Sequence, residues 1–137
     1  MEELKEKILN KTATVNVFGM GYVGIPLLVH IGNSGFKVHG TDIDDFRVQA
    51  LSKGQNPLVD LAEIEVKLLS ELLSKGRASF SKTPNAHSDI KIICVQTPMF
   101  EDRRPNLNAA KAVAKTIGQS LKPGNLVINE STVAPGM

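Results

Sequence analysis

The sequence predicts an α/β fold, a doubly wound parallel sheet with helices on both faces. Two observations carry this prediction. Short β-rich apolar segments alternate with segments of helical spacing along most of the chain, which is the pattern of βαβ units. Glycine or polar residues follow several of the predicted strands, at the carboxyl ends where a sheet of this kind binds its ligands.

The elements expected in the first half of the chain begin with an amphipathic helix at residues 2–10. Residues 13–18 are β-rich and mostly apolar, which predicts the first strand. Residues 22–33 have helical spacing and end close to a glycine, as many helices do. Residues 36–41 predict a second short strand, and residues 44–52 predict a helix that another glycine closes.

The second half continues the alternation. Residues 60–74 predict a longer helix, again closed by a glycine, and residues 78–81 predict a third strand. Residues 90–96 are mostly apolar and predict a buried strand. Residues 108–121 have helical spacing, and residues 126–129 predict the last strand.

Length and composition exclude several classes of protein. The 137 residues suffice for one domain, which we expect at 13–137 after a helical lead-in at 1–12. A net charge of +2 and 4% aromatic residues argue against nucleic-acid binding, and no apolar run is long enough to cross a membrane. One cysteine and three scattered histidines predict no metal site. The single cysteine and the lack of a signal-peptide pattern favour the cytoplasm.

A glycine-rich turn follows the first predicted strand. Its residues, Gly19, Met20, Gly21, Tyr22, Val23 and Gly24, match the G-x-G-x-x-G pattern of Rossmann-like dinucleotide sites. The first glycine permits a tight turn, the second lets a pyrophosphate approach the backbone, and the third lets the helix pack on the strand. Pro26 is expected inside that helix, where it removes the hydrogen bond to the carbonyl of Tyr22.

An acidic residue about 20 positions further on completes the dinucleotide pattern. This residue is Asp42, at the end of the second predicted strand. Its carboxylate is placed to bind the adenosine ribose hydroxyls and would repel a 2′-phosphate, which favours NAD over NADP. Arg47 leaves three interpretations open, because a nearby arginine can accept that phosphate, stack on adenine or lie on a solvated helix surface.

Four motifs, in order, resemble the amino-terminal domain of the UDP-glucose/GDP-mannose dehydrogenase family. They are Gly19–Pro26, Gly40–Asp44, Cys94–Pro98 and Glu130–Gly136, and they extend over nearly the whole chain after residue 12. In that family, full-length enzymes oxidise the C6 alcohol of a nucleotide sugar to a carboxylate with two NAD⁺, through an aldehyde and a cysteine thioester. The resemblance implies the NAD-binding domain of an enzyme whose substrate is UDP-glucose or a UDP-N-acetylhexosamine.

The resemblance also implies a set of cofactor ligands. Besides the glycine turn, Asp42 and Arg47, these are Val95, Gln96, Thr97, Pro98, Ser131 and Thr132. Thr132 resembles a residue near the nicotinamide and the reacting carbon, where it supports catalysis. The alternative for Thr97 and Thr132 is that their hydroxyls only cap the following helices.

The family's nucleophilic cysteine and its sugar-binding domain belong to segments downstream of this sequence. Cys94 lies in a buried apolar strand, where a thiol is expected to be inert. We therefore expect this chain alone to be inactive, and the resemblance implies a homodimer at full length. Two other functions stay open, a stand-alone NAD(H)-sensing module and a related dehydrogenase that acts on a hydroxy acid or its CoA ester.

Overall fold

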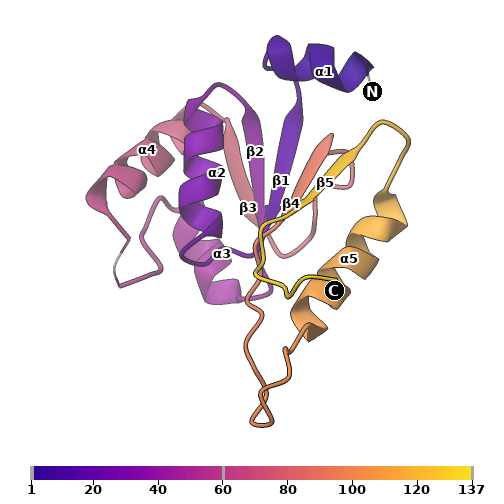
Figure 1. Ribbon diagram of the computed structural model, residues 1–137. Coiled ribbons are helices and arrows are strands. Elements are labelled where there is room, and N and C mark those ends of the chain that lie inside the picture. The colour runs from indigo at the N-terminus through magenta and orange to yellow at the C-terminus, as the bar shows by residue number, and fades with distance from the viewer. Residues whose placement is uncertain (1, 60, 137) are drawn as a thin grey trace.

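A computed structural model describes residues 2–59 and 61–136, and these residues contain a five-stranded parallel sheet (Figure 1). The strands are β1 (Thr14–Phe18), β2 (Lys37–Thr41), β3 (Ala78–Ser81), β4 (Ile90–Ile93) and β5 (Leu126–Asn129). They lie in the order β3-β2-β1-β4-β5, and each neighbouring pair is parallel. The chain therefore starts in the middle of the sheet, winds outward to β3 and returns to β4 on the other side of β1. This is the doubly wound Rossmann-like order that the sequence predicts.

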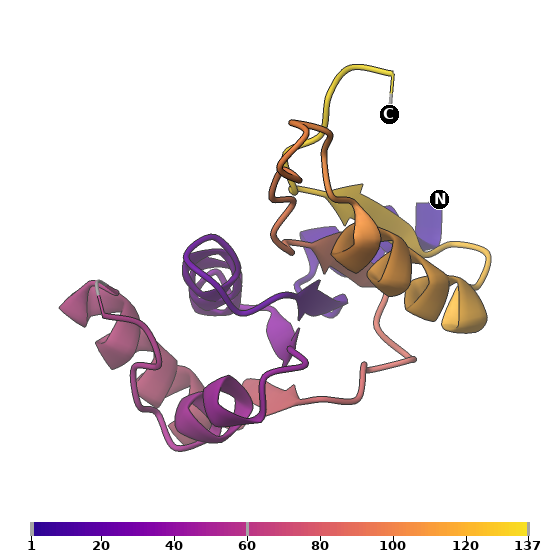
Figure 2. The ribbon, with the colours of Figure 1, turned by 90° about the horizontal axis from the view of Figure 1, so that it is seen from below.

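The helices are α1 (Glu2–Leu9), α2 (Gly24–Asn33), α3 (Asp45–Ser52), α4 (Glu63–Ser74) and α5 (Asn108–Ser120). Helices α2, α3 and α4 lie on one side of the sheet and α5 lies on the other, which confirms the prediction of helices on both faces (Figure 2). In the described part of the chain, no helix has the length and apolar character needed to cross a membrane.

The main hydrophobic core lies between the sheet and the layer formed by α2 and α4. It includes Val17 of β1, Leu28 of α2 and Leu69 of α4, all fully buried. A smaller cluster forms where α5 packs on the sheet, with Phe18 and Ile117 at its centre. The two clusters fix the carboxyl ends of β1 and β4 between two packed layers.

Helix α2 begins at Gly24, two residues later than its spacing predicts. The reason is Pro26, which has no N–H to donate to the carbonyl of Tyr22. A bond from Ile25 N to Gly21 O, at 3.1 Å, precedes the gap at Pro26, and the continuous helical series then starts with the bond from Leu27 N to Val23 O, also at 3.1 Å. Pro26 thus lies inside the helix, as predicted, and specifically in its first turn, where proline is tolerated.

Strand β4 ends at Ile93, although the apolar sequence predicts a strand to Gln96. The ladder stops because β1, its neighbour, turns away at Gly19, whose φ is +96°. The helix predicted from residue 60 begins at Glu63, and Asp60 lies outside the described residues. The other boundaries agree with the sequence-based ranges to within one residue.

Candidate functional site

A cleft of about 280 Å³ opens at the carboxyl ends of β1, β2 and β4. This is the point where the strand order reverses, the usual ligand position in such sheets. Its lining residues are Phe18, Gly19, Gly21, Thr41, Asp42, Ile43, Arg47, Cys94, Val95, Gln96, Ala109, Ala112 and Val113. A second cleft, of about 230 Å³, lies between α1 and the segments that precede β4 and β5, and it contains no predicted site residue.

Two glycines of the turn are required by the protein itself. A Cβ on Gly19 would lie 2.6 Å from the carbonyl oxygen of Cys94, and the φ of +96° is strained for any other residue. A Cβ on Gly24 would lie 1.8 Å from the carbonyl oxygen of Gly19. These contacts explain the tight turn and the close packing of α2 on β1.

Gly21 differs from both of these glycines. A Cβ placed on it would meet no described atom within 4 Å, so protein packing gives no reason for a glycine there. Gly21 lines the cleft, and its missing side chain leaves the backbone open on the cleft side. A cofactor pyrophosphate that must approach the backbone closely would explain why residue 21 is a glycine.

Backbone donors surround this open position. Within residues 2–59 and 61–136, the amide N–H groups of Gly21, Tyr22, Val23 and Gly24 have no hydrogen-bond acceptor. They lie at the amino end of α2, where the helix dipole is positive. Unpaired N–H groups at such an end bind phosphate, so these residues fit the pyrophosphate of a dinucleotide.

Asp42 is held in a fixed position at the edge of the cleft. Its Oδ2 accepts a hydrogen bond of 2.7 Å from Met20 N, and its Oδ1 accepts one of 2.9 Å from Asp44 N. The residue is only 7% exposed. Each carboxylate oxygen still has an unused lone pair, so Asp42 can accept hydrogen bonds from two ribose hydroxyls without moving.

Arg47 lies beside Asp42 on α3. Its Nη1 is 3.6 Å from Asp42 Oδ2, and its Nε is 3.7 Å from Asp44 Oδ2. Asp44 also caps α3, because its Oδ1 accepts a hydrogen bond of 3.3 Å from Arg47 N. The guanidinium is therefore shared by two carboxylates at the rim of the cleft. This argues against two of the interpretations of Arg47, a residue on a solvated helix surface and a free cation for a 2′-phosphate.

The loops after β4 and β5 are joined by two side-chain hydrogen bonds. Ser131 Oγ donates to Val95 O at 2.7 Å, and Thr97 Oγ1 donates to Thr132 O at 2.6 Å. The hydroxyl of Thr132 itself has no partner among the described residues, and the side chain is exposed. Among the described residues neither hydroxyl caps a helix, which argues against the helix-capping alternative, and the Thr97 hydroxyl instead joins the two loops.

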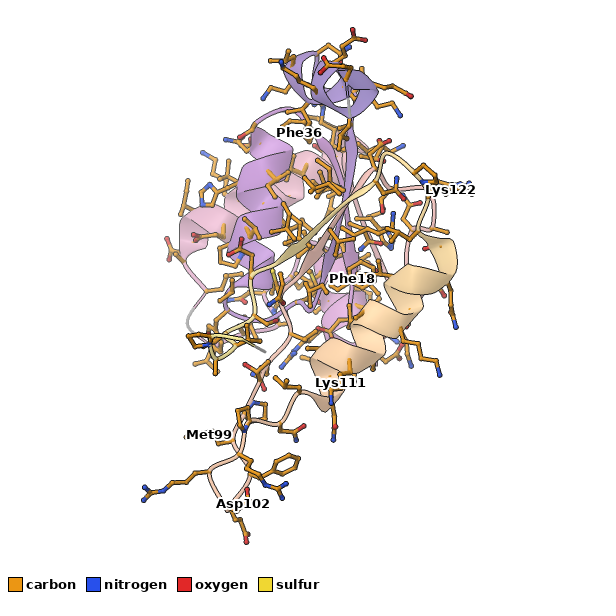
Figure 3. All side chains as sticks on the ribbon, turned by 45° about the vertical axis from the view of Figure 1, so that its right-hand side comes forward. Phe18, Phe36, Met99, Asp102, Lys111 and Lys122 are labelled. Atoms are coloured by element: carbon orange, nitrogen blue, oxygen red, sulfur yellow. The ribbon has the colours of Figure 1, made fainter. Side chains whose placement is uncertain are left out.

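A hairpin-like loop continues from Pro98. Asn106 N donates to Pro98 O at 2.7 Å, and a bridge joins Met99 to Pro105. Figure 3 shows Met99 and Asp102 on this loop, which projects away from the body of the domain, whereas Phe18 lies inward between the sheet and α5.

The structure places the sequence-predicted residues in three groups. Gly19, Gly21, Asp42, Arg47, Val95 and Gln96 line the cleft together. Tyr22, Val23, Gly24, Thr97, Pro98, Ser131 and Thr132 lie on the adjoining turns but not in its wall. Met20 has its side chain in the core, so only its backbone can contribute, and its N–H already binds Asp42.

An apolar part of the cleft wall was not predicted from the sequence. Ala109, Ala112 and Val113 of α5 line it together with Ile43 and Phe18, and Val113 also packs on the cluster that contains Phe18. The run of alanines at the start of α5 was the available signal, because small side chains on one face leave room for a flat ligand. Ile43 adds to this wall beside Asp42, and it is an apolar residue that is 90% exposed.

Cys94 lines the cleft but is not activated. Burial raises the pKa of its thiol to about 11, and the nearby carboxylate of Glu130 acts in the same direction. A thiolate is the nucleophilic form of cysteine, so this environment disfavours covalent catalysis by Cys94. Within the described residues, His, Cys, Asp and Glu side chains form no group of three that could hold a metal ion.

Comparisons with known proteins agree with this geometry. Residues 13–137 match the family described as "UDP-glucose/GDP-mannose dehydrogenase family, NAD binding domain". The chain is 36% identical over 126 residues to UDP-N-acetyl-D-glucosamine 6-dehydrogenase of Pseudomonas aeruginosa, a match that covers 92% of this chain and 29% of that protein. It is 33% identical over 138 residues to UDP-N-acetyl-D-mannosamine dehydrogenase of Methanococcus aeolicus, with 98% of this chain and 30% of that protein covered.

The fold is also similar to that of a solved dehydrogenase structure. The UDP-N-acetyl-mannosamine dehydrogenase Cap5O from Staphylococcus aureus superimposes with a TM-score of 0.83 at 34% identity, over 90% of this chain and 30% of that one. The chain thus spans under a third of the length of these relatives.

Proposed function

Because this chain belongs to the UDP-glucose/GDP-mannose dehydrogenase family, whose NAD-binding domain it carries, we propose that it serves an enzyme that oxidises the C6 alcohol of a UDP-sugar to a carboxylate with two NAD⁺. We propose a UDP-N-acetylhexosamine as the sugar in preference to UDP-glucose. The relatives at 36% and 33% identity are named for UDP-N-acetylglucosamine and UDP-N-acetylmannosamine, which supports this choice.

In this proposal the chain's residues bind and orient the cofactor. The free amides at the start of α2 hold the pyrophosphate, and Asp42 holds the adenosine ribose through its remaining lone pairs. The apolar wall of α5 and Ile43 excludes water from the flat parts of the ligand. When bound, NAD⁺ supplies the hydride acceptor.

The chemical step needs groups beyond this cleft. Cys94 keeps its proton at neutral pH, so the cysteine thioester of the family requires another residue. Thr132 is the described residue that we assign a supporting catalytic role, because its hydroxyl is exposed and unpaired at the end of β5. We accordingly propose that this chain alone does not oxidise UDP-sugars. A buried free thiol also fits a reducing compartment such as the cytoplasm.

The single observation that carries the proposal is the open space at Gly21. Because a Cβ there meets no described atom, Gly21→Ala should fold normally and yet obstruct the pyrophosphate. Gly118 of α5 is a matched control, because a Cβ on it also meets nothing within 4 Å and it does not line the cleft.

Calorimetric titration of the 137-residue chain with NAD⁺ tests the proposal. We expect the unmodified chain and Gly118→Ala to bind, and Gly21→Ala to bind at least about tenfold more weakly, since a methyl group displaces the phosphate from its donors. Equal binding by all three proteins, with circular dichroism unchanged, would contradict a pyrophosphate at Gly21. An unmodified chain that gives no heat with NAD⁺ would contradict the cofactor assignment.

A further inference from the structure

Arg47 is placed where a 2′-phosphate would need a cation, but its guanidinium is already paired with Asp42 and Asp44. Rossmann-like sites that accept NADP use an arginine near the end of the second strand to hold that phosphate. Here the guanidinium contacts Asp42 Oδ2 through Nη1 at 3.6 Å and Asp44 Oδ2 through Nε at 3.7 Å. Two carboxylates against one guanidinium leave the rim of the cleft with a net negative charge.

The two carboxylates are not equivalent. Asp42 is buried and fixed by two backbone N–H groups, and it is the proposed ribose ligand. Asp44 has a side chain that is 44% exposed, and only one of its oxygens is used for capping α3. Its second oxygen, Oδ2, faces the guanidinium of Arg47. Asp44 therefore carries a negative charge at the rim that neither the fold nor the ribose requires.

We propose that Asp44 determines cofactor specificity: by pairing with Arg47 it prevents that guanidinium from serving a 2′-phosphate, and the site selects NAD⁺ over NADP⁺. This inference rests on the proposed NAD-binding function. It assigns part of the discrimination to a residue that is no ribose ligand and acts through Arg47. Asp44 is a positioning residue for Arg47.

The capping role of Asp44 can be separated from its charge. Asparagine caps a helix about as well as aspartate, so Asp44→Asn keeps the bond to Arg47 N and removes only the charge. Asp44→Ser is a second variant that caps without charge. Asp45, the next residue, is a matched control because its Oδ2 accepts from Gln49 Nε2 at 2.7 Å and does not contact Arg47.

The experiment measures dissociation constants for NAD⁺ and NADP⁺ on the 137-residue chain, those for NADP⁺ by competition. In Asp44→Asn and Asp44→Ser we expect the ratio of the NADP⁺ to the NAD⁺ constant to fall about fivefold, the range of one partly exposed charge pair. In Asp45→Asn we expect this ratio to change by less than about twofold, because the Asp45 carboxylate binds Gln49 and does not contact Arg47. The change should shrink in 0.5 M salt, about three times the physiological ionic strength, because exposed charges are screened there.

A double variant that also replaces Arg47 tests whether Asp44 acts through Arg47. Adding Arg47→Gln to Asp44→Asn should return the ratio to that of Arg47→Gln alone, since Asp44 acts through Arg47. An equal shift in Asp44→Asn and Asp45→Asn would overturn the inference in favour of general charge, as would no shift in either capping variant. If the chain binds NAD⁺ but the ratio of the two dissociation constants is unchanged in the Asp44 variants, this inference is refuted and the proposed function is not. A chain that binds neither dinucleotide refutes it together with the proposed function.

Discussion

The hydroxyl of Thr97 donates a hydrogen bond of 2.6 Å to the backbone carbonyl of Thr132. The two residues are 35 positions apart, and their contact joins the loop that leaves β4 to the loop that leaves β5. A parallel bond from Ser131 Oγ to Val95 O completes the connection. The exposed hydroxyl of Thr132 therefore stands on a loop whose backbone is fixed by its neighbours.

Thr97→Val should destabilise the domain by about 1 kcal/mol, the usual net value of one lost hydrogen bond. Thr132→Val should leave the free energy of unfolding unchanged to within about 0.5 kcal/mol, because its exposed hydroxyl has no described partner. Urea unfolding of both variants checks this pair. Equal destabilisation by the two substitutions would show that the Thr132 hydroxyl has a structural role after all.

Asp42→Ala should weaken NAD⁺ binding by about 1–3 kcal/mol, because charge-assisted hydrogen bonds to the ribose are lost. The same change leaves Met20 N and Asp44 N without their acceptor, so a lower melting temperature is also expected. Asp42→Asn keeps an acceptor oxygen and separates the two effects. Titration of the unmodified chain is the check on the assignment, since NADP⁺ bound as tightly as NAD⁺ would contradict it.

The sequence predicts the sheet and the glycine turn well because both follow from local patterns. Apolar β-rich runs form the strands, and the spacing of the glycines marks the turn, in which Gly24 packs closely on the carbonyl of Gly19. It fails where a boundary depends on a neighbouring strand. The end of β4 is set by the direction that Gly19 gives to β1, and no property of the residues after Ile93 reveals it.

A similar limit applies to buried polar groups. Lys91 is 1% exposed in the middle of β4, although a fully buried strand of a parallel sheet is normally apolar. Its Nζ donates to Ser88 O at 2.6 Å and to Asn125 Oδ1 at 3.1 Å. Ser88 is only three residues away in the sequence, but Asn125 is 34 residues away and becomes a neighbour of Lys91 only in the folded chain. The apolar wall given by α5 to the cleft was missed for the same reason.

Cys94 should make the stability of the domain sensitive to alkaline pH. Burial raises the pKa of its thiol from 9.0 to about 11 in the folded state. Between these values the unfolded chain loses the proton and the folded chain keeps it, so the free energy of unfolding falls as pH rises. Urea unfolding at pH 8 and pH 10 should show a smaller fall for Cys94→Ala than for the unmodified chain.

The same thiol should resist alkylation. At pH 8 only about one folded molecule in a thousand carries the thiolate, so iodoacetamide should modify the native chain far more slowly than the urea-unfolded chain. Rapid modification of the native chain at pH 8 would mean that the Cys94 thiol is activated. It would contradict the conclusion that Cys94 is not the catalytic nucleophile.

Thr132 has a proposed supporting role in catalysis, which a substitution of its hydroxyl tests. In a full-length enzyme that contains this domain, Thr132→Ala should lower kcat about 10²-fold and leave the NAD⁺ dissociation constant nearly unchanged, as expected for one hydrogen bond made in the transition state. The fixed backbone of the loop makes this test sharp, because Thr97 holds the carbonyl of Thr132 and not its hydroxyl. Removing the hydroxyl should therefore disturb neither the loop nor the fold. Thr132→Ser is the matched control, and it should recover most of the activity because it restores the hydroxyl without the methyl group. An unchanged kcat in Thr132→Ala would end the catalytic assignment, and a weakened NAD⁺ affinity with unchanged kcat would make Thr132 a cofactor ligand only.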